Sequence, residues 1–335
     1  STEFEGGLID APLRVMNPHL WKNTLSLATY LGIKTYPVRT YMACSWLFED
    51  RTETWLTTTR SRIGNFPIIN NRKGLQQYGW RLVKGMLQLK TAIAKFFKSK
   101  DQDITLAEFI NQHDIEEVFW HGAVMPVLYT ICTCNPKTIG EWPAKPLLIF
   151  LRQLTDGDAL LRIQGGTPAL VDKLIENINI QSGSAISKVT EQDDKVLVEN
   201  NKGEQQLFDR VVVATPTTKI EEFLDPVQFA DDIALLKQFR FEQGQLVIHT
   251  DPSVMPPKRK DWSVDRKFTR QQFTVWLNSV EPSLVGKNAV FQTWQPVTEI
   301  DPKKVISTVT LTRAVVDSQT VALNKELQQR HKSAN

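Results

Sequence analysis

Few residues in this sequence have the types and spacing that chemistry requires. His249 and Asp251 lie two positions apart, and a carboxylate near a histidine can orient the ring and tune its proton affinity. The alternative, which we favour, is that His249 simply ends a strand that enters a loop. We find no nucleophile triad, no metal-spaced cluster and no Walker loop. Redox chemistry carried by a bound cofactor is the class that remains.

The stretch from residue 162 to residue 224 is the part of the chain best suited to position a cofactor. It opens with Gly165-Gly166, after which Thr167 is expected to cap a helix whose first position is Pro168. The two glycines provide backbone freedom and close packing, although a helix N-terminus at Thr167 could also face a phosphate. A glycine turn leading into a helix is therefore predicted here.

Strand patterns follow this helix. Residues 185–189 and 195–198 are predicted to form two strands joined by a charged turn. The run from Asp209 to Pro216 is rich in β-branched residues, which is typical of a strand buried on both faces.

The order of these pieces resembles the flavin-dependent amine oxidase and phytoene desaturase superfamily. The resemblance includes the Asp-x-Val-Val-x-Ala-x-Pro pattern that begins at Asp209, the Ile-Asp-x-Pro-Leu-Arg pattern at 9–14 and the His-Thr-Asp-x-x-x-Met-Pro pattern at 249–256. The last two are similar to a subgroup of amine-oxidase-like oxidoreductases predicted to bind NAD or FAD. Each motif is moderately specific, and the strength of the resemblance lies in their order.

The resemblance implies FAD as the cofactor and an α/β fold with α+β elements. A partial, Rossmann-like FAD-binding domain would be interwoven with a substrate domain of mixed sheet and helices. The implied segments are 1–38 and 161–224 for FAD binding, 39–160 and 225–315 for the helical and sheet parts of the substrate domain, and 316–335 for a C-terminal helix.

The resemblance also implies cofactor-binding residues. Ile186 would lie under the adenine, and Arg14 could place positive charge near the reduced flavin. The alternatives are a plain core strand position for Ile186 and a surface ion pair for Arg14. The full set of predicted cofactor-binding residues is Asp10, Pro12 and Arg14 along the flavin, with Ile186, Ala214, Thr215 and Pro216 around the adenosine.

The glycine-rich turn that would hold the diphosphate is absent from this sequence. None of the 16 glycines forms Gly-x-Gly. The resemblance would place a βαβ unit of roughly 30 residues before Ser1 and a flavin-contacting segment after Asn335. We therefore expect the sequence to be the middle of a longer protein, and expect this fragment to be inactive by itself.

Composition limits the range of partners. The 335 residues carry 40 basic and 37 acidic side chains, too balanced a charge to indicate nucleic-acid binding. Cys44, Cys132 and Cys134 lack redox or zinc spacing, so reduced thiols in a cytoplasmic location are expected. Residues 73–98 predict a basic amphipathic helix. Contact with a membrane surface is possible for such a helix but not favoured, since solvated lysines on a packed helix are commoner.

The remaining patterns predict further elements. Strands are expected at 8–15, 41–48, 53–59, 245–249, 272–278, 289–294 and 308–315, with helices after Asn17, after Thr105 and at 231–238 and 317–331, and a mobile loop at 252–270. The aromatic residues Phe291, Trp276 and Trp294 could line a flavin cavity or pack a core.

Two functional hypotheses follow. The first is an oxidoreductase of the amine-oxidase type that transfers a hydride from an amine or a lipid- or polyene-like small molecule to FAD. A flavin-dependent isomerase is a close variant. The second is a non-catalytic fragment or flavin-free homologue that acts as a binding module. Neither the catalytic residues nor the oligomeric state follows from the sequence.

Overall fold

A computed structural model describes most of the chain and groups it into two compact units. The first unit comprises Ser1–Glu176 with Gln243–Arg313, and the second comprises Asn177–Glu242 with Ala314–Asn335. The predicted assignment of segments to an FAD-binding domain and a substrate domain stays a prediction. The described residues are 2–38, 42–45, 54–60, 67–69, 72–156, 160–262, 264–267 and 272–333.

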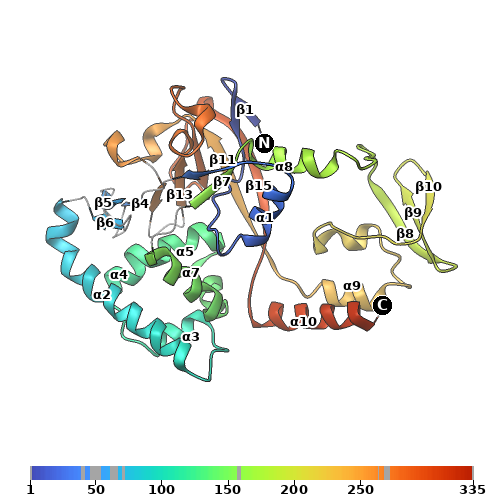
Figure 1. Cartoon of the computed structure of the whole chain (residues 1–335), viewed down its shortest axis with the longest axis horizontal. Coiled ribbons are helices and arrows are strands. Elements are labelled where there is room, and N and C mark those ends of the chain that lie inside the picture. The colour runs from blue at the N-terminus through green and yellow to red at the C-terminus, as the bar shows by residue number, and fades with distance from the viewer. Residues whose placement is uncertain are drawn as a thin grey trace. The chain divides into compact units, whose positions relative to one another are not determined.

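An eight-stranded mixed sheet is the centre of the first unit (Figure 1). The described registers are antiparallel except for the parallel pair β12–β4. The predicted strands that begin at residues 41, 53, 245, 272, 289 and 308 are confirmed within the described residues. In spatial order the strands are β15 (Val305–Ala314), β11 (Phe241–His249), β14 (Phe291–Trp294), β13 (Gln272–Trp276), β12 (Val264–Lys267), β4 (Met42–Ser45), β5 (Thr54–Arg60) and β6 (Pro67–Ile69).

The two faces of this sheet are buried differently. Leu246, Ile248, Phe273 and Val275 alternate along β11 and β13 and form one apolar core with Ile9. The opposite face carries buried polar residues and a smaller cluster that includes Val254, Met255 and Phe291. Both faces are therefore covered, by different segments of the chain.

β12 lies inside the region predicted to be a mobile loop. Its residues Val264–Lys267 pair with β13 and with β4, so that prediction is wrong for these four positions. The basic and proline-containing composition around them hid a strand that pairs with the nearby β13 and with β4, which is distant in sequence. The other short turns of this region and its neighbours are the 3₁₀ segments Pro252–Val254, Arg259–Asp261, Leu277–Ser279, Pro282–Leu284 and Pro302–Lys304.

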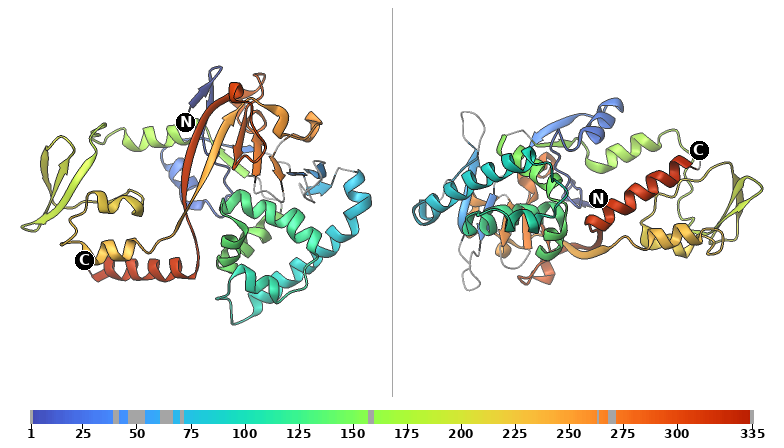
Figure 2. Two further views of the ribbon diagram at one scale, coloured as in Figure 1. Left: turned by 180° about the vertical axis from the view of Figure 1, so that it is seen from behind. Right: turned by 90° about the horizontal axis from the view of Figure 1, so that it is seen from below.

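A block of helices covers one end of the first unit (Figure 2). The capping box at Thr105 is confirmed, since its side chain and that of Glu108 bond reciprocally to the helix backbone. Among the described residues, no helix is long and apolar enough to cross a membrane. The block comprises α2 (Arg72–Lys98), α3 (Leu106–Asn111), α4 (Glu117–Phe119), the π-helical turn η1 (Trp120–Val124), α5 (Met125–Cys132), α6 (Pro136–Glu141) and α7 (Ala144–Asp156).

The N-terminal segments of the first unit position the candidate site. β1 (Thr2–Phe4) and β2 (Gly7–Ile9) form a hairpin, and β3 (Thr35–Val38) pairs with β7 (Leu160–Ile163). The strand predicted at 8–15 ends at Ile9, because Pro12 has no N–H and the N–H of Leu13 donates to the side chain of Gln292 instead. The helices of this region are α1 (Lys22–Tyr30) and α8 (Gly166–Ile175).

The second unit contains a three-stranded antiparallel meander and the closing helix. The predicted strands at 185 and 195 are confirmed, but the strand predicted over 209–216 is wrong. Residues 210–214 form no strand, and Val212 is 90% exposed. An apolar β-branched run needs neighbouring strands to bond its backbone, and none of the described residues pairs with it. The unit comprises β8 (Ile186–Gln192), β9 (Lys195–Asn200), β10 (Gln205–Phe208), the 3₁₀ turn η2 (Thr217–Glu222), α9 (Ala230–Leu236) and α10 (Ser318–Ser333).

Candidate functional site

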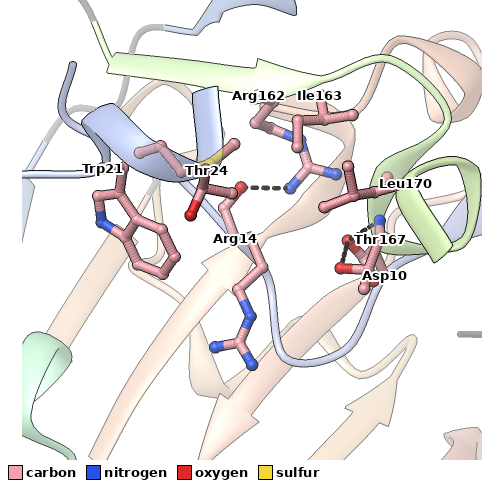
Figure 3. A pocket seen from close by; sticks show the side chains of 10 residues that line it. Asp10, Arg14, Trp21, Thr24, Arg162, Ile163, Thr167 and Leu170 are labelled. Carbon is pink, nitrogen blue, oxygen red and sulfur yellow. Dashed lines mark hydrogen bonds between the residues drawn. The ribbon is translucent and has the colours of Figure 1, made fainter. Parts of the chain in front are cut away.

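A cavity of about 170 Å³ lies in the first unit, at the start of helix α8 (Figure 3). Its wall comes from three places: the loop after β2, the start of α1, and the β7–α8 connection. Most of the lining surface is apolar, although the lining residues include two arginines and an aspartate. The lining residues are Asp10, Arg14, Met16, Trp21, Thr24, Arg162, Ile163, Gly166, Thr167 and Leu170.

Asp10 caps helix α8 from a loop that is distant in sequence. Its Oδ2 accepts hydrogen bonds from the backbone N–H and the hydroxyl of Thr167, each 2.9 Å long. Thr167 is therefore a donor inside the first turn, and the expectation that its own side chain caps the helix is wrong; Gly165 occupies the N-cap position. Since a carboxylate already occupies this helix N-terminus, we assign no phosphate to it.

Gly166 makes this close approach possible. Its φ is +65°, and a Cβ atom added there would lie 3.0 Å from Asp10 Oδ2 and 3.1 Å from a methyl of Leu8. A side chain at this position would be strained and would press on the carboxylate. The Gly-Gly turn thus serves backbone freedom and close packing, as the sequence predicts.

A buried ion pair fixes the opposite wall of the cavity. Arg162 is 1% exposed, and its Nη2 lies 2.9 Å from Oε2 of Glu281. Its Nε donates to the hydroxyl of Tyr36 at 3.0 Å, and its Nη1 donates to the backbone carbonyl of Arg14 at 3.2 Å. Burial raises the pKa of Tyr36 above its ordinary value, so the phenol stays protonated. One guanidinium therefore joins β3, β7, the loop after β2 and the turn at Glu281.

Arg14 presents its own guanidinium to the cavity. The side chain extends into the space bordered by Trp21 and Asp10 (Figure 3). The residue is exposed, and within the described part of the chain its guanidinium makes neither an ion pair nor a hydrogen bond. The surface ion pair considered as an alternative for Arg14 is thus not formed among these residues. An unpaired positive charge therefore borders the cavity, whose lining also includes the Asp10 carboxylate and the buried Arg162.

His249 does not act with the carboxylate of Asp251. Its ring is fully buried, Nδ1 accepts from the backbone N–H of Asp251 at 3.1 Å, and Nε2 lies 2.7 Å from the hydroxyl of Thr293. This geometry requires a neutral ring that donates from Nε2. Burial lowers the pKa of His249 to about 4. The structural role that the sequence favours for this histidine is confirmed.

The Asp251 carboxylate has partners of its own. It accepts from the backbone N–H groups of Ser253 and Asp301 and pairs with Lys304. The aromatic residues near this strand end also belong to the core, since Phe291 is 0% and Trp294 6% exposed. Neither aromatic residue lines the cavity at α8.

The predicted residues fall into two groups. Asp10 and Arg14 line the cavity, and Pro12 lies between them on the same loop after a cis peptide bond. Ile186, Ala214, Thr215 and Pro216 belong to the second unit. Ile186 begins β8 with its side chain 42% exposed, and residues 214–216 are exposed coil before η2. Their role in holding the adenosine stays a prediction.

Sequence reasoning missed several cavity residues. Arg162 had no role assigned, nor had Trp21, Thr24 or the distant partner Glu281. A signal was present, because Arg162 is a charged residue inside the apolar strand Leu160–Ile163, directly before the Gly-Gly turn. A charged residue in a buried strand requires a partner, but the identity of that partner depends on the fold.

Comparisons with known proteins find solved structures that share this fold. Structures of similar fold include a fatty acid isomerase from P. acnes (TM-score 0.61, 13% identity, 98% of this chain and 81% of that chain covered). They also include a protein described as a protoporphyrinogen oxidase from Exiguobacterium sp. 255-15 (TM-score 0.60, 12% identity, 97% of this chain and 81% of that chain covered). A putrescine oxidase triple mutant is a third (TM-score 0.57, 9% identity, 97% of this chain and 68% of that chain covered).

At these identities the likenesses establish the fold, a mixed α/β arrangement of the flavin amine oxidase kind. The sequence comparison with curated proteins gives no match. The family model for flavin-containing amine oxidoreductases matches residues 1–317. The chain therefore belongs to the flavin-containing amine oxidoreductase family.

Proposed function

We propose that the protein is an FAD-dependent oxidoreductase that transfers a hydride from a substrate carbon to the flavin. The substrate class we propose is an amine or a lipid- or polyene-like molecule. The observation that carries the proposal is the unpaired guanidinium of Arg14 at the cavity beside α8, whose lining surface is mainly apolar. Family membership supplies the context, since the family is defined as flavin-containing.

The residues of this cavity fit the ring system of a flavin. Met16, Trp21, Ile163 and Leu170 offer apolar surface to a flat aromatic ring. Arg14 can place positive charge beside the ring edge that becomes negative on reduction. Gly166 lets Asp10 approach the start of α8 closely, because a Cβ there would lie 3.0 Å from Asp10 Oδ2. Asp10 occupies the α8 N-terminus, so we leave no diphosphate at that helix. That Ile186, Ala214, Thr215 and Pro216 hold the adenosine stays a separate proposal.

The residues of the chain position, shield and polarise rather than move protons. When bound, the flavin supplies the acceptor for two electrons and one proton. Arg14 would stabilise negative charge on a bound flavin electrostatically, and the apolar lining surface would limit the water around the ring, which would strengthen that stabilisation. The Arg162–Glu281 pair holds the carbonyl of Arg14 and thus the loop that carries its side chain.

His249 makes no contribution as a base in this scheme. Both of its ring nitrogens are used in buried hydrogen bonds. A hydride transfer needs few ionisable groups, so the proposed reaction does not require His249 as a base. Cys44, Cys132 and Cys134 are buried and form no disulfide bonds, which supports a reducing compartment, and we propose a cytoplasmic location.

Flavin titration tests the proposal. The purified chain is titrated with FAD, FMN and riboflavin while flavin fluorescence is followed. We expect saturable quenching by all three, because each carries the ring, with the tightest binding for FAD. Absence of quenching with every flavin would overturn the proposal for this chain and would support the binding-module hypothesis.

A turnover assay separates oxidation from isomerisation. With candidate amines, fatty acids and polyenes, an oxidoreductase consumes one two-electron acceptor for each product formed. An isomerase forms product without consuming an acceptor. Product formation without consumption of acceptor would replace the proposed reaction while leaving the flavin site intact.

A further inference from the structure

Helix α2 has one face that is committed to the core of the first unit. Tyr78, Leu82, Leu89, Ile93 and Phe96 are all buried and recur at three- and four-residue spacing over the 27 residues of the helix. On the same face, a Cβ atom added to Gly85 would lie 2.3 Å from the side chain of Phe119, so the helix packs closely against α4. This stripe accounts for the helix as part of the fold.

A second apolar stripe lies on the opposite face of α2. Trp80 is 75% exposed, Leu87 56% and Val83 43%, and the three recur at i, i+3 and i+7. We call these three residues the Trp80 face. Both views of Figure 2 show α2, in light blue to cyan, at the outside of the helical block. A Trp and a Leu that are mostly exposed on one stripe are not needed for packing within this unit.

The charge of α2 has a single sign. Its sequence contains no Asp or Glu, and its basic residues are Arg72, Lys73, Arg81, Lys84, Lys90, Lys95 and Lys98. Lys84 and Lys90 are exposed and lie on either side of the Trp80 face. Among the described residues neither forms an ion pair, whereas Arg81 pairs with Glu116. The net charge of the whole chain is +3, so the positive charge is concentrated on this helix rather than spread evenly.

We propose that the Trp80 face binds an anionic membrane surface, with α2 lying in the plane of the interface. Trp80, Val83 and Leu87 would enter the headgroup region, and Lys84 and Lys90 would contact anionic headgroups on either side. A tryptophan is favoured at such an interface because its ring is apolar and its N–H remains hydrated. The helix lies on the membrane and does not cross it, in keeping with its seven basic residues.

The arrangement favours a membrane over other anionic partners. A nucleic acid or an acidic protein surface would satisfy the lysines, but the centre of the face is apolar and would gain nothing from contact with phosphates or carboxylates. A lipid surface provides negative charge at its boundary and hydrocarbon beneath it. The same order occurs here, with lysines at the sides and apolar residues in the middle.

Vesicle flotation with the full chain tests the proposal. Vesicles of phosphatidylcholine alone are compared with vesicles that also contain phosphatidylglycerol, at low and at high salt. We expect binding to the anionic vesicles, little binding to the neutral ones, and weaker binding as salt rises. Lys84→Gln/Lys90→Gln is expected to lower the partition coefficient about fivefold per lysine. Lys145→Gln/Lys258→Gln, two exposed lysines elsewhere in the first unit, is the matched control and should have little effect.

Apolar variants separate a membrane from other polyanions. Trp80→Ser/Leu87→Ser should lower vesicle binding at least tenfold. Tyr30→Ser/Val285→Ser, which changes residues that are 86% and 69% exposed in the same unit, should not. All of these positions are exposed, so circular dichroism and the melting temperature should match the parent protein. Binding to heparin or DNA that exceeds vesicle binding and is insensitive to Trp80→Ser/Leu87→Ser would overturn the proposal.

Depth-dependent quenching gives a second readout. Brominated lipids in anionic vesicles should quench part of the tryptophan fluorescence of the parent protein. Trp80→Phe should still bind but should lose that quenching, because the phenyl ring preserves apolar contact and removes the fluorophore at the interface. Quenching that persists in Trp80→Phe, or failure of the parent protein to bind anionic vesicles at low salt, would show that this face does not meet a membrane.

Discussion

The carboxylate of Asp10 caps helix α8 through Thr167, the second residue of the helix. Two hydrogen bonds of 2.9 Å, from the backbone N–H and the hydroxyl of Thr167, end on the same oxygen. Asp10 is 6% exposed, so water cannot readily replace it. This single carboxylate joins the loop after β2 to the start of α8 and thereby shapes one wall of the cavity.

Replacement of Asp10 by Ala should destabilise the protein by about 1–2 kcal/mol, because buried donors at the helix start lose their acceptor. Chemical denaturation in urea measures this loss. Asp10→Asn retains one acceptor oxygen and should lose less. Equal stability of Asp10→Ala and the parent protein would show that the cap contributes nothing.

Arg162→Met should destabilise the protein by about 3–5 kcal/mol, because it leaves the Glu281 carboxylate buried without its partner. The double variant Arg162→Met/Glu281→Gln should recover part of this loss. Lys173→Met, which breaks the exposed pair with Glu176, is the matched control and should change stability by at most about 1 kcal/mol. Urea unfolding of the parent protein, the two Arg162 variants and Lys173→Met measures these differences. Equal losses of stability in Arg162→Met and Lys173→Met would contradict the prediction.

Arg14→Gln should weaken flavin binding about tenfold, corresponding to the loss of one charge-assisted interaction of ~1.5 kcal/mol. The reduction potential of bound flavin should become more negative, since positive charge near the reduced ring favours reduction. Arg14→Lys retains the charge, so its flavin affinity and reduction potential should lie between those of Arg14→Gln and the parent protein. Fluorescence titration and spectroelectrochemistry provide the readouts, and an unchanged potential would place Arg14 away from the ring.

His249 predicts a window of pH dependence. Its folded pKa of about 4 lies below the ordinary 6.5, mainly because burial penalises the charged ring. The unfolded chain therefore binds the proton first, so stability is fully present above pH 6.5 and is lost as the pH falls through 4. The loss amounts to about 3 kcal/mol.

Urea unfolding between pH 7 and 4 measures this dependence. His249→Gln cannot titrate, so its stability should be lower at pH 7 but flatter across the window. The hydrogen-bonded Asp251 carboxylate has a lowered pKa, about 2, and would act below this range. The same pH slope in His249→Gln and the parent protein would assign the dependence to another group.

The thiols of Cys44 and Cys132 should be unreactive in the folded protein. Burial raises the pKa of each to about 12, which leaves almost no thiolate at neutral pH. Alkylation by iodoacetamide should proceed only as fast as the chain opens, and should become fast in urea. Mass spectrometry of peptides identifies each site. Rapid labelling of either thiol in the native protein would contradict its burial.

The sequence alone determined the family and most of the elements. Periodicity located α2, α8, α9 and α10, because an apolar stripe at helical spacing depends on nearby residues. The Thr105 capping box and the strands at 186 and 195 followed for the same reason. The order of the motifs was enough to indicate a flavin amine oxidase, because that order can be read directly along the sequence.

Tertiary structure decided which residues meet. Neither the Asp10–Thr167 bond nor the Arg162–Glu281 pair could be predicted, because each joins segments more than a hundred residues apart and depends on how strands and loops are stacked. The same reason explains the errors at 209–216 and at β12. A β-branched run remains coil where no strand pairs with it, and a polar loop becomes a strand where two partners supply hydrogen bonds. Local sequence sets what an element can be, and long-range contacts set which possibility is realised.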